Sequence, residues 1–257
     1  MIRIAVVLGS TRPGRLGKAV ADWVHARAAE RGDAAFEVLD VADFALPLLD
    51  EPVPPSRGRY SHEHTRAWSQ AVDAFDGYIF VTGEYNHSIP GALKNALDYL
   101  YKEWNNKAAG FVSYGSAGGT RAVEHLRSVA GELQLADVRA QVALPLATEF
   151  ENYRTFTPSE GAERNLQTLL DQVTAWAAAL KVLRPGKEPR RDKTVPGTSA
   201  RTSTGRRRVW SGTLMRCSPR GAVTERFDRR ARHSWRQPAG RRCHRGRPGR
   251  GWAANRR

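Results

Sequence analysis

The chain has 257 residues, which is enough for one or two domains, and its net charge of +15 is distributed unevenly. Residues 1–184 hold 19 Lys and Arg against 22 Asp and Glu, whereas residues 185–257 hold 22 against 4. Because the first segment is slightly acidic, the charge excludes an interpretation of the whole chain as a nucleic-acid-binding protein.

The composition changes at the same position. The first segment is rich in Ala, Val, Leu and aromatic residues, and a domain of about 180 residues buries roughly 70% of the surface of its unfolded chain. The second segment is dominated by Arg, Gly, Pro, Ser and Thr. Its scattered apolar side chains cannot offset about 1–2 kcal/mol of backbone entropy per residue. We therefore expect a folded domain over residues 1–184 and a disordered basic tail over residues 185–257.

Cysteine and hydropathy patterns exclude further classes. Cys217 and Cys243 both lie in the expected tail, so the folded domain needs no disulfide. Together with His233 and His244 they lack the paired short spacings of a zinc site, and we expect no metal. The N-terminal apolar run is too short for a signal sequence, and no run approaches the ~18 apolar residues of a membrane span. We therefore expect a cytoplasmic protein without a membrane segment.

The first segment alternates strand and helix patterns. Short apolar runs, typical of strands buried on both faces, predict strands over residues 2–8, 35–39, 78–82, 108–114 and 138–144. Apolar residues at helical spacing predict helices over residues 16–31, 61–75, 90–104, 120–133 and 159–183, the second capped by Ser61 and preceded by a Pro-rich loop over residues 43–59. The alternation predicts an α/β fold in which a five-stranded parallel sheet carries helices on both faces.

In such open sheets ligands bind outside the carboxyl ends of the strands, so the loops after the first, third and fourth strands carry the functional signal. Residues 9–18 combine small residues, the hydroxyls of Ser10 and Thr11, and two arginines, Arg12 and Arg15, at the start of a helix. These groups suit a phosphate. The loop is neither a Walker A motif nor a dinucleotide fingerprint, because Arg12 and Thr11 replace required glycines.

The other two loops suit a planar ligand. Residues 83–91 end at a helix N-terminus, so their main-chain N–H groups can face a pocket, and a heteroaromatic ring can stack near Tyr85. Residues 113–119 are small enough to let a ring approach the main chain. Three such loops at one edge of one sheet predict a single binding site.

Three segments (GSTRPGRLGKAVADWV at 9–24, EYNHSIPGALKNALDYLYKEW at 84–104 and GFVSYGSAGGTRAVEHLR at 110–127) resemble the NADPH-dependent FMN reductase family. The resemblance covers residues 2–182 and implies a flavodoxin-like, doubly wound fold. It implies that the FMN phosphate is held by Ser10, Thr11, Arg12, Arg15, Leu16 and Gly17, and that the isoalloxazine is lined by Glu84, Tyr85, Asn86 and His87 and flanked by Ser113, Tyr114, Gly115, Ser116 and Gly118. One departure is Gly83, where family members usually have Pro.

The resemblance implies an FMN-dependent oxidoreductase that takes a hydride from NADPH or NADH and reduces a small acceptor: a quinone, an azo compound, a metal oxyanion or free flavin. The two substrates would alternate on one face of the flavin, which gives ping-pong kinetics, and no side chain need act as general acid. Homodimers or homotetramers are common in the family. Tyr99, Tyr101 and Trp104 have helical spacing and suit a core or a subunit interface.

Three alternatives stay open. A dinucleotide-dependent dehydrogenase would use Asp40 as its ribose contact, although Asp40 follows the glycine-containing loop by about 30 residues and such a contact usually follows it by ~20. A nucleic-acid- or polyanion-binding protein would act through the arginines of residues 185–257. Those residues also resemble GC-rich DNA translated in another frame, in which case they have no selected function.

Overall fold

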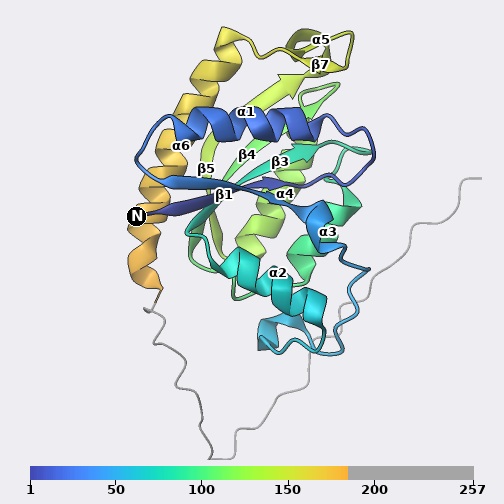
Figure 1. The fold of residues 1–257 in the computed structure, drawn as a ribbon, viewed down its shortest axis with the longest axis vertical. Helices are drawn as coiled ribbons and strands as arrows, with labels where there is room; N and C mark the ends of the chain where they lie inside the picture. The colour runs from blue at the N-terminus through green and yellow to red at the C-terminus, as the bar shows by residue number, and fades with distance from the viewer. Residues whose placement is uncertain (185–257) are drawn as a thin grey trace, which may run out of the picture. The chain divides into compact units, whose positions relative to one another are not determined.

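The computed structural model describes residues 1–184, so the predicted tail over residues 185–257 lies outside the described residues. Five parallel strands form the main sheet in the order β2-β1-β3-β4-β5 (Figure 1). Their bounds are Arg3–Leu8 (β1), Ala35–Asp40 (β2), Gly77–Gly83 (β3), Lys107–Gly115 (β4) and Leu135–Pro145 (β5). This is the flavodoxin-like order, and it reverses direction between β1 and β3. The predicted five-stranded parallel sheet is confirmed.

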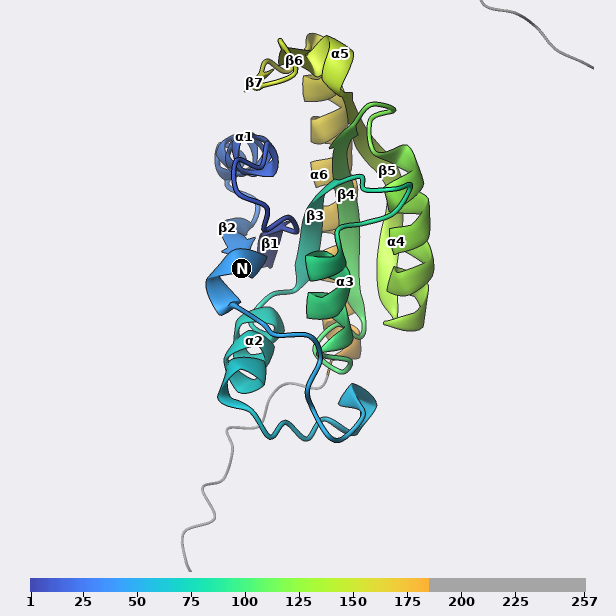
Figure 2. The same ribbon diagram turned by 90° about the vertical axis from the view of Figure 1, so that its right-hand side faces the viewer.

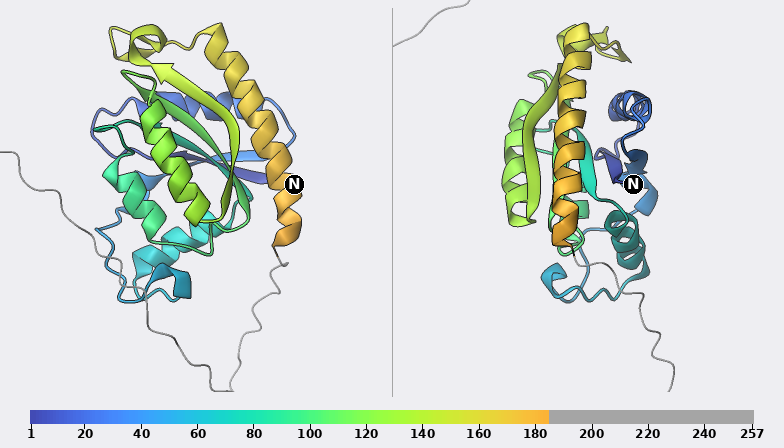
Figure 3. Two further views of the ribbon diagram at one scale, coloured as in Figure 1. Left: turned by 180° about the vertical axis from the view of Figure 1, so that it is seen from behind. Right: turned by 90° about the vertical axis from the view of Figure 1, so that its left-hand side faces the viewer.

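Helices cover both faces of the sheet. Helices α1 (Gly17–Ala29) and α6 (Glu160–Leu180) pack on one face, and α2 (Glu63–Asp73), α3 (Gly91–Asp98) and α4 (Thr120–Glu132) pack on the other (Figure 2). From behind, α6 runs along the sheet beside β4 and β5 (Figure 3). In β3, which is buried at every position, Ile79 and Val81 contribute to one core and Tyr78 and Phe80 to the other. This double burial explains its unbroken apolar sequence.

Short elements at the ends of the sheet were absent from the predicted list. They are the 3-10 turns η1 (Val41–Phe44), η2 (Pro55–Arg57) and η3 (Lys181–Leu183), a short helix α5 (Leu146–Glu149), and a hairpin of β6 (Phe150–Glu151) with β7 (Thr155–Phe156). Each is four residues or shorter per segment. Such lengths give no readable periodicity.

Two helix predictions need correction. The third helix ends at Asp98 instead of residue 104, although Tyr99 and Trp104 are still buried in the core as expected. Ser61 is not the cap of α2, because the helix begins at Glu63. The main-chain N–H groups of Ser61 and its neighbour instead donate to the carboxylate of Glu51, at 2.7 and 3.0 Å. The carboxylate of Glu51 thus holds the two residues that precede α2, and the N-cap residue, His62, makes no side-chain cap hydrogen bond.

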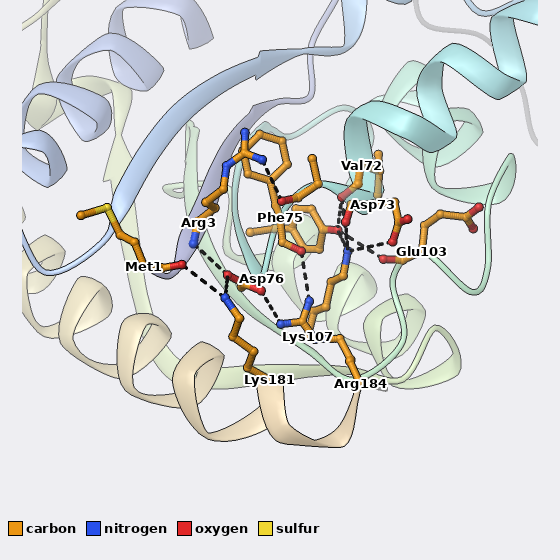
Figure 4. Close-up of polar contacts among 12 residues, drawn as sticks. Met1, Arg3, Val72, Asp73, Phe75, Asp76, Glu103, Lys107, Lys181 and Arg184 are labelled. Atoms are coloured by element: carbon orange, nitrogen blue, oxygen red, sulfur yellow. Dashed lines mark hydrogen bonds and ion pairs between the residues drawn. The ribbon is translucent and has the colours of Figure 1, made fainter. Parts of the chain in front are cut away.

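Lys107 is buried at the amino edge of the sheet, the edge at which the parallel strands begin. There its side chain contacts the C-terminal end of α2 (Figure 4). Its Nζ donates to the hydroxyl of Tyr78 at 2.9 Å and to the carbonyl of Val72 at 3.3 Å. The Tyr78 hydroxyl donates to the same carbonyl at 2.9 Å. Burial, followed by the charge of Asp73, raises the pKa of Tyr78 well above its ordinary value. The last carbonyls of α2 are therefore satisfied by side chains from two strands.

Asp76 joins three chain segments at the same edge (Figure 4). Its carboxylate accepts from the main-chain N–H of Arg3 at 2.9 Å, from Lys181 Nζ at 3.0 Å and from the guanidinium of Arg184. Burial alone raises the pKa of Asp76, but these hydrogen bonds outweigh it and hold the pKa below its ordinary value of 3.8. We call Tyr78, Lys107, Asp76, Lys181 and Arg184 the amino-edge cluster.

Candidate functional site

Three loops meet at the carboxyl edge of the sheet, around the point where the strand order reverses. They are the first loop (residues 9–16, between β1 and α1), the second loop (residues 84–90, between β3 and α3) and the third loop (residues 116–119, between β4 and α4). The sequence prediction named residues in or beside each of them. The structure separates those residues into exposed groups and buried supports.

Arg15 is a support of the first loop. Its guanidinium forms a bidentate ion pair with Asp40 at the end of β2, in which Nη1 donates to Oδ1 at 2.9 Å. The same guanidinium donates to the carbonyl of Ser10. Asp40 additionally accepts from the N–H of Ala42 at 3.0 Å. The charge of Arg15 is thus neutralised within the protein. The carboxylate that a dehydrogenase would offer to a ribose is already occupied, so the structure does not favour that alternative.

Arg12 differs from Arg15 in both exposure and partners. It is exposed, and its Nε donates to the hydroxyl of Tyr85 in the second loop at 3.2 Å. Within residues 1–184 Arg12 forms no ion pair with an acidic side chain. A cation without a carboxylate partner, close to the start of α1, is well placed to attract an anion.

Tyr114 lies beneath the first loop. Its side chain is buried, its hydroxyl is 3.3 Å from Ser10 Oγ, and burial raises its pKa. Two glycines make room for it: a Cβ at Gly17 would lie 2.7 Å from the Tyr114 hydroxyl, and one at Gly83 would lie 3.2 Å from the ring. Gly83, the departure from the family pattern, therefore packs directly against a buried tyrosine.

The second loop contains a tight turn whose two central residues are left-handed. Tyr85 and Ser88 exchange both main-chain hydrogen bonds, at 2.9 and 3.0 Å. Asn86 and His87 between them have φ values of 50° and 67°, as in a type I′ turn. Within the described residues the N–H groups of Asn86 and His87 donate to no protein acceptor. They are exposed donors at the edge of the site.

The third loop is held from inside. Ser113 is fully buried and donates to the carbonyl of Gly118 at 2.7 Å, and Gln141 donates to the Ser113 hydroxyl at 3.2 Å. Gly118 has φ +69°, which favours glycine. Ser116 and Ala117 are exposed, and their N–H groups find no acceptor within residues 1–184.

The predicted site residues consequently fall into two sets. Exposed at the edge are Thr11, Arg12, Tyr85, Asn86, His87 and Ser116. Buried or partly buried are Ser10, Arg15, Leu16, Gly17, Glu84, Ser113, Tyr114, Gly115 and Gly118. Sequence analysis did not identify Asp40, Arg121 or His125 as residues that hold these loops. Each contact joins residues at least 25 positions apart, so no local pattern reports it.

A cavity of about 290 Å³ lies beside the first loop. Its walls are of mixed polarity and carry no charged side chain; they come from Thr11, Val41, Ala42, Ala45, Leu46, Ala92 and Asn95. Within residues 1–184, no group of three or more His, Cys, Asp or Glu side chains is arranged to hold a metal ion. None of the helices in that range has the length and apolar character needed to cross a membrane.

Comparisons with known proteins identify the family. The family model of NADPH-dependent FMN reductases matches residues 2–149. An NAD(P)H-dependent FMN reductase, ntnL, from Nectria sp is 42% identical over 188 residues, covering 70% of this chain and 90% of the relative. A 2-hydroxy-1,4-benzoquinone reductase from Burkholderia sp is 30% identical over 190 residues, covering 70% and 99%.

A solved structure supports the fold. The NAD(P)H:acceptor oxidoreductase FerB from Paracoccus denitrificans superposes with a TM-score of 0.52 at 23% identity, covering 70% of this chain and 98% of FerB. At this identity the likeness extends to the fold alone. The strand order of the sheet agrees with it.

Proposed function

The chain belongs to the NADPH-dependent FMN reductase family, and from this premise we propose which residues hold the cofactor and which acceptor is reduced. Family membership makes the protein an oxidoreductase that uses FMN and NAD(P)H. We propose that its acceptor is a small quinone. Two observations support a quinone: the Burkholderia relative is a 2-hydroxy-1,4-benzoquinone reductase, and the side chains that line the cavity beside the first loop are uncharged. Azo compounds, metal oxyanions and free flavin are the competing acceptors.

The carboxyl edge fits a phosphorylated planar cofactor. Among residues 1–184, the N–H groups of Asn86, His87, Ser116 and Ala117 have no protein acceptor, and Arg12 has no carboxylate partner. These groups are the main support for placing FMN at this edge. The N–H groups can donate to the ring carbonyls of FMN, and the cation can pair with its phosphate. Bound FMN would supply the redox chemistry, taking a hydride from NAD(P)H and passing electrons to the acceptor.

The phosphate would be held by the first loop. Thr11 and the start of α1 offer donors, and Arg12 offers the charge. Arg15 would keep the loop in place through Asp40 instead of contacting the phosphate. Ser10 has a similar supporting role, because its buried hydroxyl faces Tyr114.

The ring would be held by main-chain donors of the second and third loops. Hydrogen bonds from fixed N–H groups become stronger as the ring gains negative charge, so they favour the reduced cofactor. No ionisable side chain of the two loops is required as an acid or base. A homodimer or homotetramer stays a prediction that rests on the family resemblance.

The first experiment is an absorbance spectrum of the purified protein, followed by titration of the cofactor-free protein with FMN. We expect flavin bands and saturable binding. The rate of NADPH and NADH oxidation is then measured with a benzoquinone, an azo dye, chromate and free FMN. A protein that binds no FMN would refute the assignment, and faster reduction of another acceptor would refute the quinone.

We also propose ping-pong kinetics, in which the two substrates would alternate beside the cofactor at the single edge where the three loops meet. Initial rates at several quinone concentrations should give parallel double-reciprocal lines. Intersecting lines would mean that donor and acceptor bind together.

A further inference from the structure

We propose that Arg121 and His125 of α4 are positioning residues that hold the second loop in the conformation that binds FMN. This inference rests on the proposed function. Arg121 Nε donates to the carboxylate of Glu84 at 2.7 Å, and His125 Nδ1 lies 3.1 Å from the hydroxyl of Ser88. The two contacts hold the second loop on either side of its left-handed turn.

The turn needs such support. Asn86 and His87 both lie in a backbone region that side-chain-bearing residues adopt at a cost, and neither side chain is buried. An exposed turn of this kind persists when the surrounding structure fixes its ends. Glu84 directly precedes the turn and Ser88 is its last residue, and both are held by α4. The direction of the Asn86 and His87 N–H groups therefore depends on α4.

Glu84 has the character of a support and not of a ligand-contacting residue. Its side chain is 6% exposed, and both carboxylate oxygens face α4, one toward Arg121 and the other 3.4 Å from the N–H of Ala122. The resemblance implied that Glu84 lines the isoalloxazine, which stays a prediction; its carboxylate lies at the N-terminus of α4, where the helix dipole favours a negative charge. Burial raises its pKa, but the hydrogen bonds from Arg121 and Ala122 outweigh burial and lower it.

The decisive variant is Arg121→Met, which keeps most of the side-chain length and removes the charge. The matched control is Arg127→Met on the same helix, because Arg127 also forms an ion pair, with Asp137, and lies over the ring of Phe111. Neither contact of Arg127 involves the second loop. Arg121→Met thus removes a cation that contacts the second loop, whereas Arg127→Met removes a cation whose contacts stabilise the fold away from that loop.

Two readouts separate positioning from general stability: the FMN dissociation constant of the cofactor-free protein, from quenching of flavin fluorescence, and its melting temperature. We expect Arg121→Met to raise the dissociation constant about tenfold, the loss of one charge-assisted contact. Arg127→Met should lower the melting temperature and change the dissociation constant less than about twofold. Arg121→Lys should restore part of the affinity.

Further variants test the pairing itself. Glu84→Gln should weaken FMN binding as Arg121→Met does, and the double variant should be no worse than either single one, because both remove the same contact. His125→Gln keeps a hydrogen-bonding group near Ser88 and should bind FMN more tightly than His125→Ala.

The outcomes are distinct. Unchanged FMN binding in Arg121→Met, or an equal loss in Arg127→Met, would refute the inference while leaving the proposed function in place. Failure of the wild-type protein to bind FMN would refute the proposed function itself.

Discussion

The two edges of the sheet use the same kinds of side chain for different purposes. At the amino edge, the amino-edge cluster joins chain segments to one another, and its polar groups are directed inward. At the carboxyl edge, Arg15, Glu84 and Tyr114 hold loops in place, while surface main-chain N–H groups find no acceptor in the described part of the chain. Stability and ligand binding should therefore be separable. A variant at one edge should change one property and leave the other.

The largest effect is expected at the amino edge. Asp76→Ala leaves Lys181 and Arg184 without their carboxylate, and the loss of a mostly buried ionic partner costs about 3 kcal/mol. The melting temperature should fall by roughly 6–12 °C. Urea unfolding and FMN titration measure the two properties separately. A change in the FMN dissociation constant that matches the change in stability would contradict the separation.

Acid should diminish this effect. Because the folded-state pKa of Asp76 lies below 3.8, its stabilising contribution is fully present above that value and is lost as the pH falls through the folded-state pKa. The stability difference between wild type and Asp76→Ala should therefore be smaller at about pH 3 than at about pH 7. Equal differences at the two pH values would show that the charge of Asp76 contributes little.

At the carboxyl edge, Arg12→Ala should produce the opposite result. Loss of a charge-assisted bond to phosphate costs roughly 1.5–3 kcal/mol, so the FMN dissociation constant should rise at least about tenfold. The melting temperature of the cofactor-free protein should stay near that of wild type, because the Arg12 side chain is exposed and, within residues 1–184, bonds to Tyr85 alone. Arg164→Ala, which removes an exposed arginine of α6, is the control. An unchanged constant would remove Arg12 from the phosphate site.

Tyr114→Phe sharpens the comparison, because Tyr114 is both buried and beneath the first loop. The variant keeps the ring against Gly83 and removes the hydroxyl, which bonds to Ser10 and to the main chain of Gly17. We expect a loss of about 1 kcal/mol in stability and a rise of a few-fold in the FMN dissociation constant. A fall in stability without any change in FMN binding would show that this hydroxyl supports the core and not the loop.

The smallest effect is expected from truncation after Arg184. All contacts of the amino-edge cluster are retained, so the melting temperature, FMN content and NADPH oxidation rate should match those of the full chain. Truncation after Leu180 removes Lys181 and Arg184 and should resemble Asp76→Ala. Loss of flavin from the longer fragment would place the domain boundary beyond residue 184.

The strands were predicted to within three residues at each end, because buried parallel strands are continuous apolar runs. The third helix was predicted too long, since Tyr101 and Trp104 have a helical spacing of three in a segment that forms turns. The three loops were also located correctly, from glycines and hydroxyls that follow strands.

Sequence could not assign the individual roles within those loops. Arg12 and Arg15 are equivalent in the sequence pattern, and the structure distinguishes them by exposure and by partner, Tyr85 for Arg12 and Asp40 for Arg15. Likewise, Tyr114 reads as a residue flanking the ring, whereas its hydroxyl meets Ser10 from 104 positions away. Contacts between residues so far apart become visible only when the sheet has brought the strands together.

The contact between Lys181 and the first residue has a consequence for protein engineering. Lys181 Nζ donates to the carbonyl of Met1 at 3.2 Å, so the end of α6 and the start of β1 are neighbours at the edge opposite the site. A short linker from Arg184 to Met1 would close the domain into a ring. New chain ends then belong in the hairpin turn at Asn152 and Tyr153, which are exposed. The order of the elements along the chain would change, but each of the three loops would still connect the same strand to the same helix.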